Sequence, residues 1–234
     1  MFDKELIQAV SDWQRGGDAK QKARRGQRLL EVASELPEKY RTADYPCFRQ
    51  IALTGSHLRH MGTEFQLAET ISSWTNSETV ARGVKGGVPP MGQGYQGVIF
   101  VITPPPGSVV VNLISLFSDG DFQSSVNEFK SEIIGFGDGI GRYSDDQQEV
   151  VLNLSSLPLE ALHAWGGYSS DERQLAARYF CRPVDENDIE YFRKQLAVNK
   201  IKLGPYWLTS PNAVKRVSHK LKLLSFRLAE LNKP

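Results

Sequence analysis

Three short stretches of the sequence carry residue types that suit one kind of chemistry. They are FRQ at 48–50, SWT at 73–75 and QQE at 147–149, and each lies at or beside a predicted strand. An arginine offers a planar, permanently charged fork that binds phosphate groups. A carboxylate held beside a sugar stabilises positive charge that develops there, and a serine on the adjacent strand fixes the carboxylate rotamer.

Together the three stretches resemble the arginine–serine–glutamate signature of the mono-ADP-ribosyltransferases, in the class with a Gln-x-Glu motif and of the bacterial or phage toxin and host-modifier type. In that superfamily an aromatic-arginine pair ends the first strand, and a Ser-x-Ser/Thr strand precedes a short helix. A Glu/Gln-x-Glu strand then follows a flexible loop. Phe48-Arg49, Ser73-Trp74-Thr75 and Gln147-x-Glu149 match these elements in turn, and the resemblance covers about Tyr45 to Leu154.

The resemblance implies an enzyme of the glycosyltransferase class that cleaves NAD at the nicotinamide N-glycosidic bond and transfers the ADP-ribose to a macromolecule. The transition state resembles the oxocarbenium ion of glycoside hydrolysis, so Glu149 is expected beside the ribose and Arg49 at the pyrophosphate. Ser73 is expected to orient Glu149. NAD is expected as co-substrate, with no metal. The other expected NAD contacts are Phe48, Gln50, Ser73 and Thr75.

Gln147 is the residue that bears on the acceptor. Alternation along a strand predicts that Gln147 and Glu149 share a face, which places Gln147 beside the reacting centre. A neutral amide cannot take a proton from a guanidinium, but it hydrogen-bonds a side-chain amide or a nucleobase edge. The acceptor is therefore predicted not to be arginine, with nucleic acid slightly favoured over protein.

The glycine-rich stretch GFGDGIGRYSDD, at 135–146, matches the position of the family's target-recognition turns. Its glycines predict a mobile loop in which Phe136 or Tyr143 offers a ring to the acceptor. An ordinary glycine-rich connection is an equally open alternative at this stage.

Other motifs have plainer interpretations. Arg41 competes with Arg49 as phosphate ligand, but its place at a predicted helix end favours a structural role. Residues 92–97 match GxGxxG in letters, yet a strand follows them rather than precedes them, which excludes a dinucleotide fingerprint. His57 and His60 lack nearby Cys, Asp or Glu partners, so no metal site is predicted.

The elements that must position these residues indicate an α+β fold. Helical spacing of apolar residues such as Leu6, Val10 and Trp13 predicts helices in the first zone. A short helix is expected from Asn76 or Ser77. The predicted strands lie at 47–54, 97–105, 108–117 and 148–154, and further helices at 185–203 and 213–232. The resemblance implies a split β-sandwich with flanking N- and C-terminal helices, divided as a helical N-terminal region at 1–42, a catalytic core at 43–157 and a basic helical extension at 158–234.

Composition sets broader bounds. The 234 residues are 40% hydrophobic and 24% charged, with a formal net charge of +1, which is ordinary for a globular protein with a real core. Only Cys47 and Cys181 are present, which argues against a disulfide scaffold and suits a reducing compartment. An N-terminus without a signal-peptide pattern and the lack of a long apolar run predict a cytoplasmic protein without a membrane partner.

Two basic regions remain. The cluster at 20–28 is interpreted as a solvated helix face, whereas the final basic helix is either a solvated domain edge or a site for an acidic partner, an inhibitor or antitoxin protein, or RNA.

The activity suits an intracellular toxin, a phage-defence protein or a host modifier. The alternatives are an NAD glycohydrolase that uses water as acceptor, and a catalytically inactive RNA- or protein-binding module on the same fold.

Overall fold

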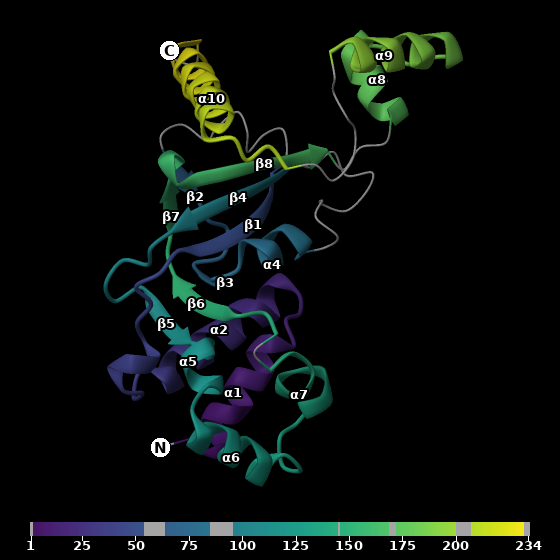
Figure 1. Ribbon diagram of the computed structural model, residues 1–234. Coiled ribbons are helices and arrows are strands. Elements are labelled where there is room, and N and C mark those ends of the chain that lie inside the picture. The colour runs from purple at the N-terminus through teal and green to yellow at the C-terminus, as the bar shows by residue number, and fades with distance from the viewer. Residues whose placement is uncertain are drawn as a thin grey trace. The chain divides into compact units, whose positions relative to one another are not determined.

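The computed structural model describes residues 2–53, 64–84, 96–144, 146–168, 172–199 and 207–231 (Figure 1). The chain divides into two compact units. The first comprises residues 1–49, 66–80 and 101–157, and the second comprises residues 50–65, 81–100 and 158–234. The units interleave along the chain, so the range 43–157 contributes to both, and the helices at 1–42 fold within the first.

The first unit combines helices with antiparallel strands. Its elements are α1 (Lys4–Gln14), α2 (Ala19–Ala33), η1 (Glu38–Tyr40), β3 (Ile71–Thr75), β5 (Val109–Asn112), α5 (Leu113–Phe117), α6 (Gly120–Phe129), η3 (Phe136–Asp138), α7 (Ile140–Tyr143) and β6 (Glu149–Asn153). Three more, β1 (Cys47–Leu53), α4 (Glu78–Gly83) and β7 (Ser156–Pro158), begin in the first unit and end in the second.

Both N-terminal helices begin at a capping aspartate. The Asp3 carboxylate accepts a hydrogen bond from the Leu6 backbone N–H at 2.9 Å, and Asp18 forms a reciprocal capping box with Gln21. Gly16 and Gly17 have φ values of 66° and 124°, which allow the tight reversal between the helices. The apolar faces of α1 and α2 then pack into one core with residues from β5, α5, α6 and β6.

The strands of the first unit pair in the order β5-β6-β3-β1. Thr75 lies opposite Glu149 and Ser73 lies opposite Val151 in the β3–β6 ladder, while Phe48 of β1 lies opposite Thr75. Residues directly opposite each other in an antiparallel pair share a face. The three strands that carry the sequence motifs are therefore neighbours, with the SWT strand in the centre.

The second unit contains the C-terminal elements of the chain together with two earlier segments. Its elements are η4 (Leu159–Ala161), β8 (Leu162–Tyr168), α8 (Glu172–Phe180), α9 (Glu186–Val198) and α10 (Pro211–Leu231), together with β2 (Glu64–Gln66) and β4 (Gln96–Ile102), which begin in this unit and end in the first. Strand β4 pairs antiparallel with β8. Helices α8 and α9 pack around Ala176, Ile189 and Phe192. Ahead of α10, Trp165 and Leu208 exchange two backbone hydrogen bonds.

The observed class is mixed α and β with an antiparallel sheet, which agrees with the α+β prediction at that level. One predicted strand was too long. Residues 108–117 form a strand only to Asn112, whose side chain accepts a hydrogen bond from the Ser115 N–H and so caps α5. None of the described helices is both long and apolar enough to cross a membrane.

Candidate functional site

Glu149 is the first residue of β6 and lies in the interior of the first unit, with 3% of its surface exposed. The indole N–H of Trp13 donates a hydrogen bond to its Oε1 atom at 2.7 Å. The Ser73 hydroxyl donates to the same oxygen. The hydrogen bond expected between Ser73 and Glu149 is therefore present, and a second donor joins it.

The other carboxylate oxygen has a different environment. Oε2 of Glu149 is buried and has no hydrogen-bond partner in the described part of the chain. Burial raises the pKa of Glu149, and the hydrogen bonds from Ser73 and Trp13 only partly oppose that shift. A buried polar atom without a partner is uncommon in a folded protein and calls for an explanation. One oxygen thus has two donors, and the other has none among the described residues.

Trp13 was not predicted as a site residue. It lies near the end of α1, and the sequence marks it only as one apolar member of that helix. A buried indole needs an acceptor for its single N–H. This need was the only feature of the sequence that could have indicated a polar partner for Trp13. The acceptor is 136 residues away in the chain, so the pattern within the helix could not identify it. Helix α1 is consequently part of the site as well as of the core.

Arg49 of β1 is largely buried, with 17% of its side chain exposed. Its Nη2 atom donates to Oε2 of Glu69 at 3.2 Å, and the ammonium group of Lys22 lies 3.4 Å from the other Glu69 oxygen. Nη1 of Arg49 is buried without a hydrogen-bond partner among the described residues. Burial lowers the pKa of Arg49, and Glu69 opposes that shift. One amino group of the fork is therefore occupied and the other is unsatisfied.

No hydrogen bond within the described residues joins Arg49 directly to Glu149 or Ser73. The structure links Ser73 and Glu149 by contact, and it links Arg49 to them through the adjacency of β1, β3 and β6. Phe48 and Thr75 lie opposite each other, and Thr75 lies opposite Glu149. Because paired positions share a face, these two predicted residues line the same side of the sheet as Glu149.

The prediction for Gln147 was wrong in its geometry. Strand β6 begins at Glu149, and Gln147 lies in the turn before it. Gln148 has a positive φ of 45°, which interrupts the alternation of side chains that the prediction assumed. Gln147 is half-buried in this turn, and strand periodicity does not place it on the face of Glu149.

The glycine-rich segment before β6 packs closely on α1, as the alternative of an ordinary connection predicts. A Cβ atom at Gly139 would collide with the backbone oxygen and hydroxyl of Ser11, so the glycine allows a close approach. The Ile140 N–H donates to the Ser11 hydroxyl at 3.3 Å, and the Gln14 amide donates to the Ser144 carbonyl at 2.9 Å.

The two rings of that segment are already in contact with the protein. Phe136 packs against the core of the first unit, and the Lys130 ammonium lies 5.5 Å from its ring centre. The Arg142 guanidinium lies 5.2 Å from the ring centre of Tyr143. Phe136 is therefore a packing residue, contrary to the expectation that it presents a free ring to the acceptor.

Gln50 belongs to the second unit. When its amide is oriented so that the nitrogen faces the nearby carbonyls, it donates to the backbone oxygens of Ala81 at 3.1 Å and Val84 at 2.9 Å. This side chain therefore holds the end of α4 against β1, and its contact with NAD stays a prediction.

The remaining candidates have limited roles. Nε of Arg41 donates to the Leu36 carbonyl at 2.9 Å, which supports the structural interpretation of this arginine. Burial raises the pKa of the Cys47 thiol to about 12. Across the described residues no group of three metal-ligating side chains occurs. His57, His60 and residues 92–95 of the GxGxxG stretch lie outside the described residues.

Comparison of the chain with protein-family models, with curated proteins and with solved structures gives no match. The interpretation of the site therefore rests on its own geometry and on the sequence motifs.

Proposed function

We propose that this protein is a mono-ADP-ribosyltransferase with a split β-sandwich core, and that it cleaves NAD between nicotinamide and ribose. The observation that carries the proposal is the state of Glu149. Two donors, Ser73 and Trp13, hold one oxygen of a buried carboxylate while the other oxygen has no partner in the described part of the chain. An ordinary structural glutamate is solvated or paired with a cation.

The roles follow from the chemistry of the bond. When the bond to nicotinamide breaks, the electron pair leaves with nicotinamide and positive charge develops on the ribose. Oε2 of Glu149 accepts the ribose 2′-hydroxyl hydrogen bond and stabilises that charge in a site of low dielectric constant. The acceptor atom then attacks the anomeric carbon and loses its proton to water. Ser73 and Trp13 keep the carboxylate in position, and Ser73, which is exposed, lies on the side from which NAD approaches.

Arg49 holds the pyrophosphate in this proposal. The unpaired Nη1 supplies the first contact, and Glu69 keeps the guanidinium plane in place through Nη2. The ion pair with Glu69 also reduces the cost of burying the arginine when no ligand is bound.

The acceptor is proposed to be a group other than arginine. In the Gln-x-Glu motif that the chain shares with the family, position 147 holds a neutral amide, which cannot deprotonate a guanidinium. Nucleic acid is the favoured acceptor, and a protein side chain is the second choice.

The decisive experiment compares Glu149→Gln with the wild-type protein in release of nicotinamide from NAD. The amide keeps an oxygen that accepts from Ser73 and Trp13 but removes the charge, so the fold should persist while the rate falls about a thousandfold. Glu128→Gln, which changes an exposed carboxylate on α6, is the matched control and should retain full activity. Near wild-type release by Glu149→Gln would refute the assignment.

A second measurement identifies the acceptor. The protein is incubated with labelled NAD and cell lysate, and the products are treated separately with protease and nuclease. Label that nuclease removes supports a nucleic-acid acceptor, and label that protease removes supports a protein acceptor. Free ADP-ribose as the sole product would show a glycohydrolase instead, and no reaction of NAD would leave a binding module.

A further inference from the structure

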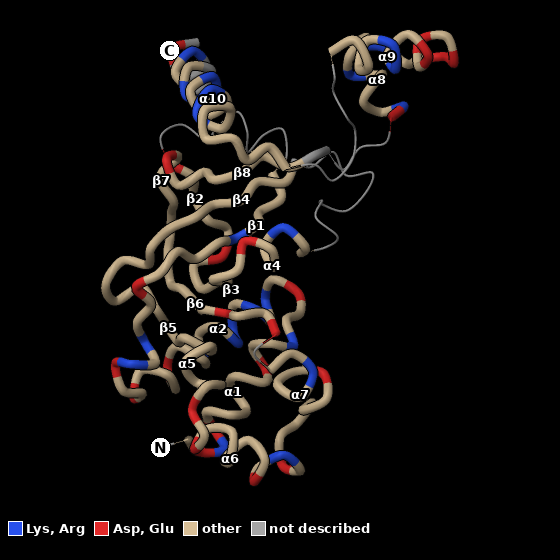
Figure 2. The backbone as a smooth tube through the Cα atoms, in the orientation of Figure 1, with Lys and Arg blue, Asp and Glu red and all other residues tan. Residues whose placement is uncertain are grey.

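The C-terminal helix α10 is unusual in its distribution of charge. It has one acid, Glu230, and five cations: Lys215, Arg216, Lys220, Lys222 and Arg227. These give the helix a formal charge of +4, whereas the whole chain carries +1, so the rest of the chain carries −3. Figure 2 shows Lys and Arg along this helix, in contrast to the mixture of both signs on α8 and α9.

The cations of α10 have no ion-pair partner in the described part of the chain, which distinguishes them from the other basic clusters. In α8 and α9 and the turn between them, Arg173, Arg182 and Arg193 each pair with a carboxylate. In the basic cluster at 20–28, Lys22 and Arg28 also pair with carboxylates, and Arg25 donates to the Gly16 carbonyl. Most cations of these other segments are therefore satisfied within the protein, whereas none of the five on α10 has a partner among the described residues.

Two large apolar side chains lie among these cations. Phe226 is 55% exposed and Leu223 is 47% exposed. Side chains four residues apart are neighbours on a helix, so Phe226 lies beside Lys222, and Leu223 lies beside Arg227. Val214, in contrast, is buried. Leu223 follows it by nine positions, which is two and a half helical turns. On this basic, partly aromatic face Leu223 and Arg227 thus lie opposite Val214, while Lys222 and Phe226 lie at its edge.

We infer that this exposed face of α10 binds single-stranded nucleic acid. Unpaired lysines and arginines contact the phosphates, and an exposed aromatic ring among them stacks on an unpaired base. An anionic membrane is a poorer match, because a helix lying on a bilayer presents its apolar side to the lipid, and here that side includes the buried Val214. The inference rests on the proposed function, in which nucleic acid is the favoured acceptor, and assigns α10 as a surface that binds nucleic acid.

The test measures binding of short labelled oligonucleotides by fluorescence anisotropy, without NAD. Arg216→Gln with Lys220→Gln is compared with Lys20→Gln with Arg24→Gln. Each pair removes one lysine and one arginine, four residues apart and exposed on a helix, so the change in net charge is the same. We expect the α10 pair to weaken binding about tenfold and to reduce the salt dependence by about 0.7 per lost phosphate contact. The α2 pair should remain within about twofold of wild type, because its cations lie outside the proposed surface.

Phe226→Ala tests the stacking, with Leu223→Ala as its control. Loss of the ring should weaken single-stranded binding about tenfold and affect a duplex of the same sequence much less, because paired bases cannot stack on it. Loss of Leu223 should have little effect on either. Single-stranded RNA and DNA are measured in parallel to identify which backbone is preferred.

Three results would overturn the inference: equal losses from the α10 and α2 pairs, no binding by the wild-type protein, or binding to phosphatidylserine vesicles without binding to oligonucleotides. Glu149→Gln should bind oligonucleotides as well as wild type does. Failure of the proposed activity would therefore leave this binding intact, and failure of the binding would leave NAD cleavage intact, so the two proposals can fail separately.

Discussion

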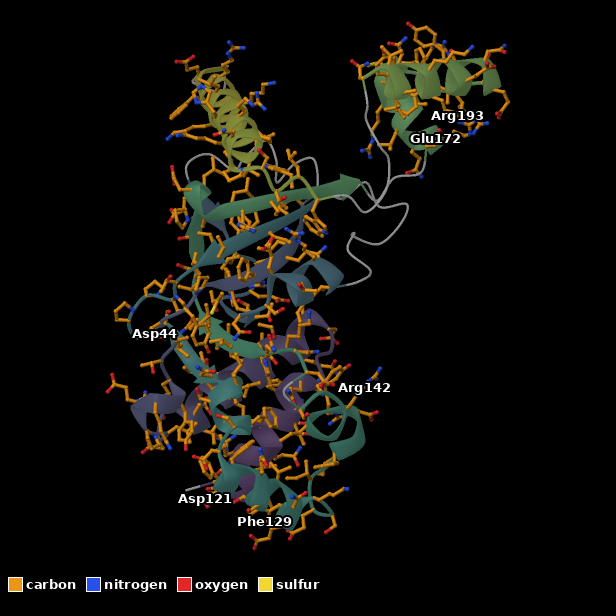
Figure 3. All side chains as sticks on the ribbon, in the orientation of Figure 1. Asp44, Asp121, Phe129, Arg142, Glu172 and Arg193 are labelled. Carbon is orange, nitrogen blue, oxygen red and sulfur yellow. The ribbon has the colours of Figure 1, made fainter. Side chains whose placement is uncertain are left out.

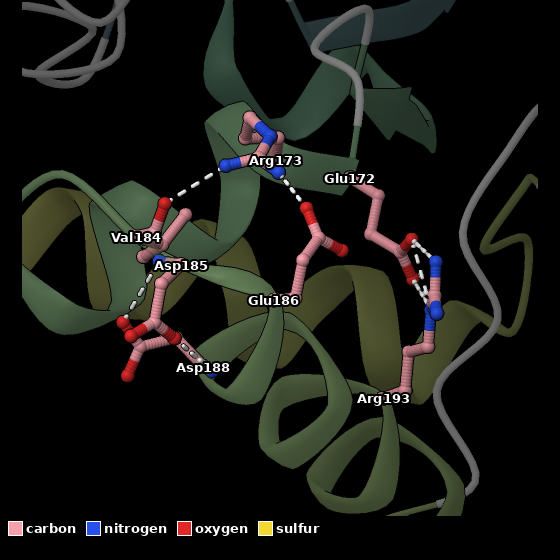
Figure 4. A network of polar contacts seen from close by, with 7 residues as sticks. All are labelled: Glu172, Arg173, Val184, Asp185, Glu186, Asp188 and Arg193. Carbon is pink, nitrogen blue, oxygen red and sulfur yellow. Dashed lines mark hydrogen bonds and ion pairs between the residues drawn. The ribbon is translucent and has the colours of Figure 1, made fainter.

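Glu149 and Glu172 are the same residue type in opposite circumstances. Glu149 is buried in the first unit, is held by two neutral donors on one oxygen, and has a raised pKa. Glu172 of α8 points toward Arg193 of α9 (Figure 3), and the Arg193 guanidinium donates to both of its oxygens at 2.6 to 3.0 Å (Figure 4). These hydrogen bonds from Arg193 lower the pKa of Glu172.

The surroundings of Glu172 repeat the same pattern. Asp188 takes two hydrogen bonds from Arg182, each 2.7 Å long, and its pKa is lowered by them. Arg173 pairs with Glu186 in the same network (Figure 4). Because α8 and α9 share only a small apolar cluster, such pairs supplement their packing. The carboxylates of this hairpin therefore serve its structure.

Glu149 differs from these carboxylates, because burying a carboxylate without a paired cation raises the free energy of the folded state. Groups of this kind concentrate at functional sites, where a polarised, partly unsatisfied side chain is useful to a ligand. The difference teaches that the number of contacts does not identify the reactive carboxylate. In the proposed function the type of partner distinguishes the two: a cation pairs with the structural carboxylate, and two neutral donors hold the carboxylate that is proposed to react.

After Glu149→Gln, the largest effect on catalysis should come from Arg49→Lys. A lysine cannot reproduce the planar fork that contacts both Glu69 and a phosphate, so kcat/KM for NAD should fall about ten- to a hundredfold and NAD affinity should fall as well. Arg41→Lys is the control, because Arg41 donates to a backbone carbonyl and its replacement should leave NAD binding unchanged. Calorimetry would check both. Unchanged affinity in Arg49→Lys would assign the pyrophosphate to another cation.

Trp13→Phe should have an intermediate effect. The variant keeps an aromatic ring but removes the indole donor that lowers the Glu149 pKa, so this pKa should rise further. In the proposed mechanism the ionised carboxylate is the active form, so the acidic limb of the pH–rate profile should move to higher pH. The rate on the plateau should fall about two- to twelvefold, as expected for one hydrogen bond.

Trp74→Phe is the matched control for this variant. Trp74 is buried in β3, and its indole donates to the Ser72 hydroxyl at 3.2 Å rather than to Glu149. Its replacement should leave the acidic limb in place. Equal displacement of the limb in both variants would show that general loosening of the core, and not the hydrogen bond from Trp13, sets the pKa.

Much of the first unit could be predicted from local patterns. Apolar spacing and the glycine pair at 16–17 locate α1 and α2, and β-branched runs locate β1 and β6. The adjacency of the motif strands also agrees with the hydrogen bond expected from Ser73 to Glu149. These features depend on a few residues close together in sequence, or on a motif whose parts occur in a fixed order.

The site predictions that were wrong, and the site contacts that were missed, have one cause in common. Gln147 was assigned by extending strand alternation one step too far, past Gln148, whose positive φ no simple pattern reveals. Phe136 was assigned to a mobile loop because glycines allow motion, but here Gly139 allows close packing on Ser11. The contacts of Trp13 and Glu69 with the site were missed because they join distant segments. Each outcome depends on tertiary contacts that periodicity within one element does not encode.

The last prediction has the smallest expected effect and concerns stability, where the two glutamates should respond with opposite signs. The folded-state pKa of Glu149 is raised above its ordinary value of 4.5, so the folded protein binds this proton more tightly than the unfolded chain does. The charge therefore destabilises the fold increasingly as pH rises through the folded pKa, and below 4.5 the penalty disappears. Glu149→Gln should raise the melting temperature of the first unit at neutral pH, and the gain should vanish in acid.

For Glu172 the dependence of folding stability on pH has the opposite sign. Its folded pKa lies below 4.5, so it contributes stability above that pH and loses the contribution as pH falls through the folded value. Glu172→Gln should lower the melting temperature at neutral pH, by less than about 2 °C because the pair with Arg193 is exposed and screened. Calorimetry from pH 4 to pH 8 checks both variants. Destabilisation by Glu149→Gln at neutral pH would show that its carboxylate is a structural group, as Glu172 is, and the distinction between the two regions would not hold.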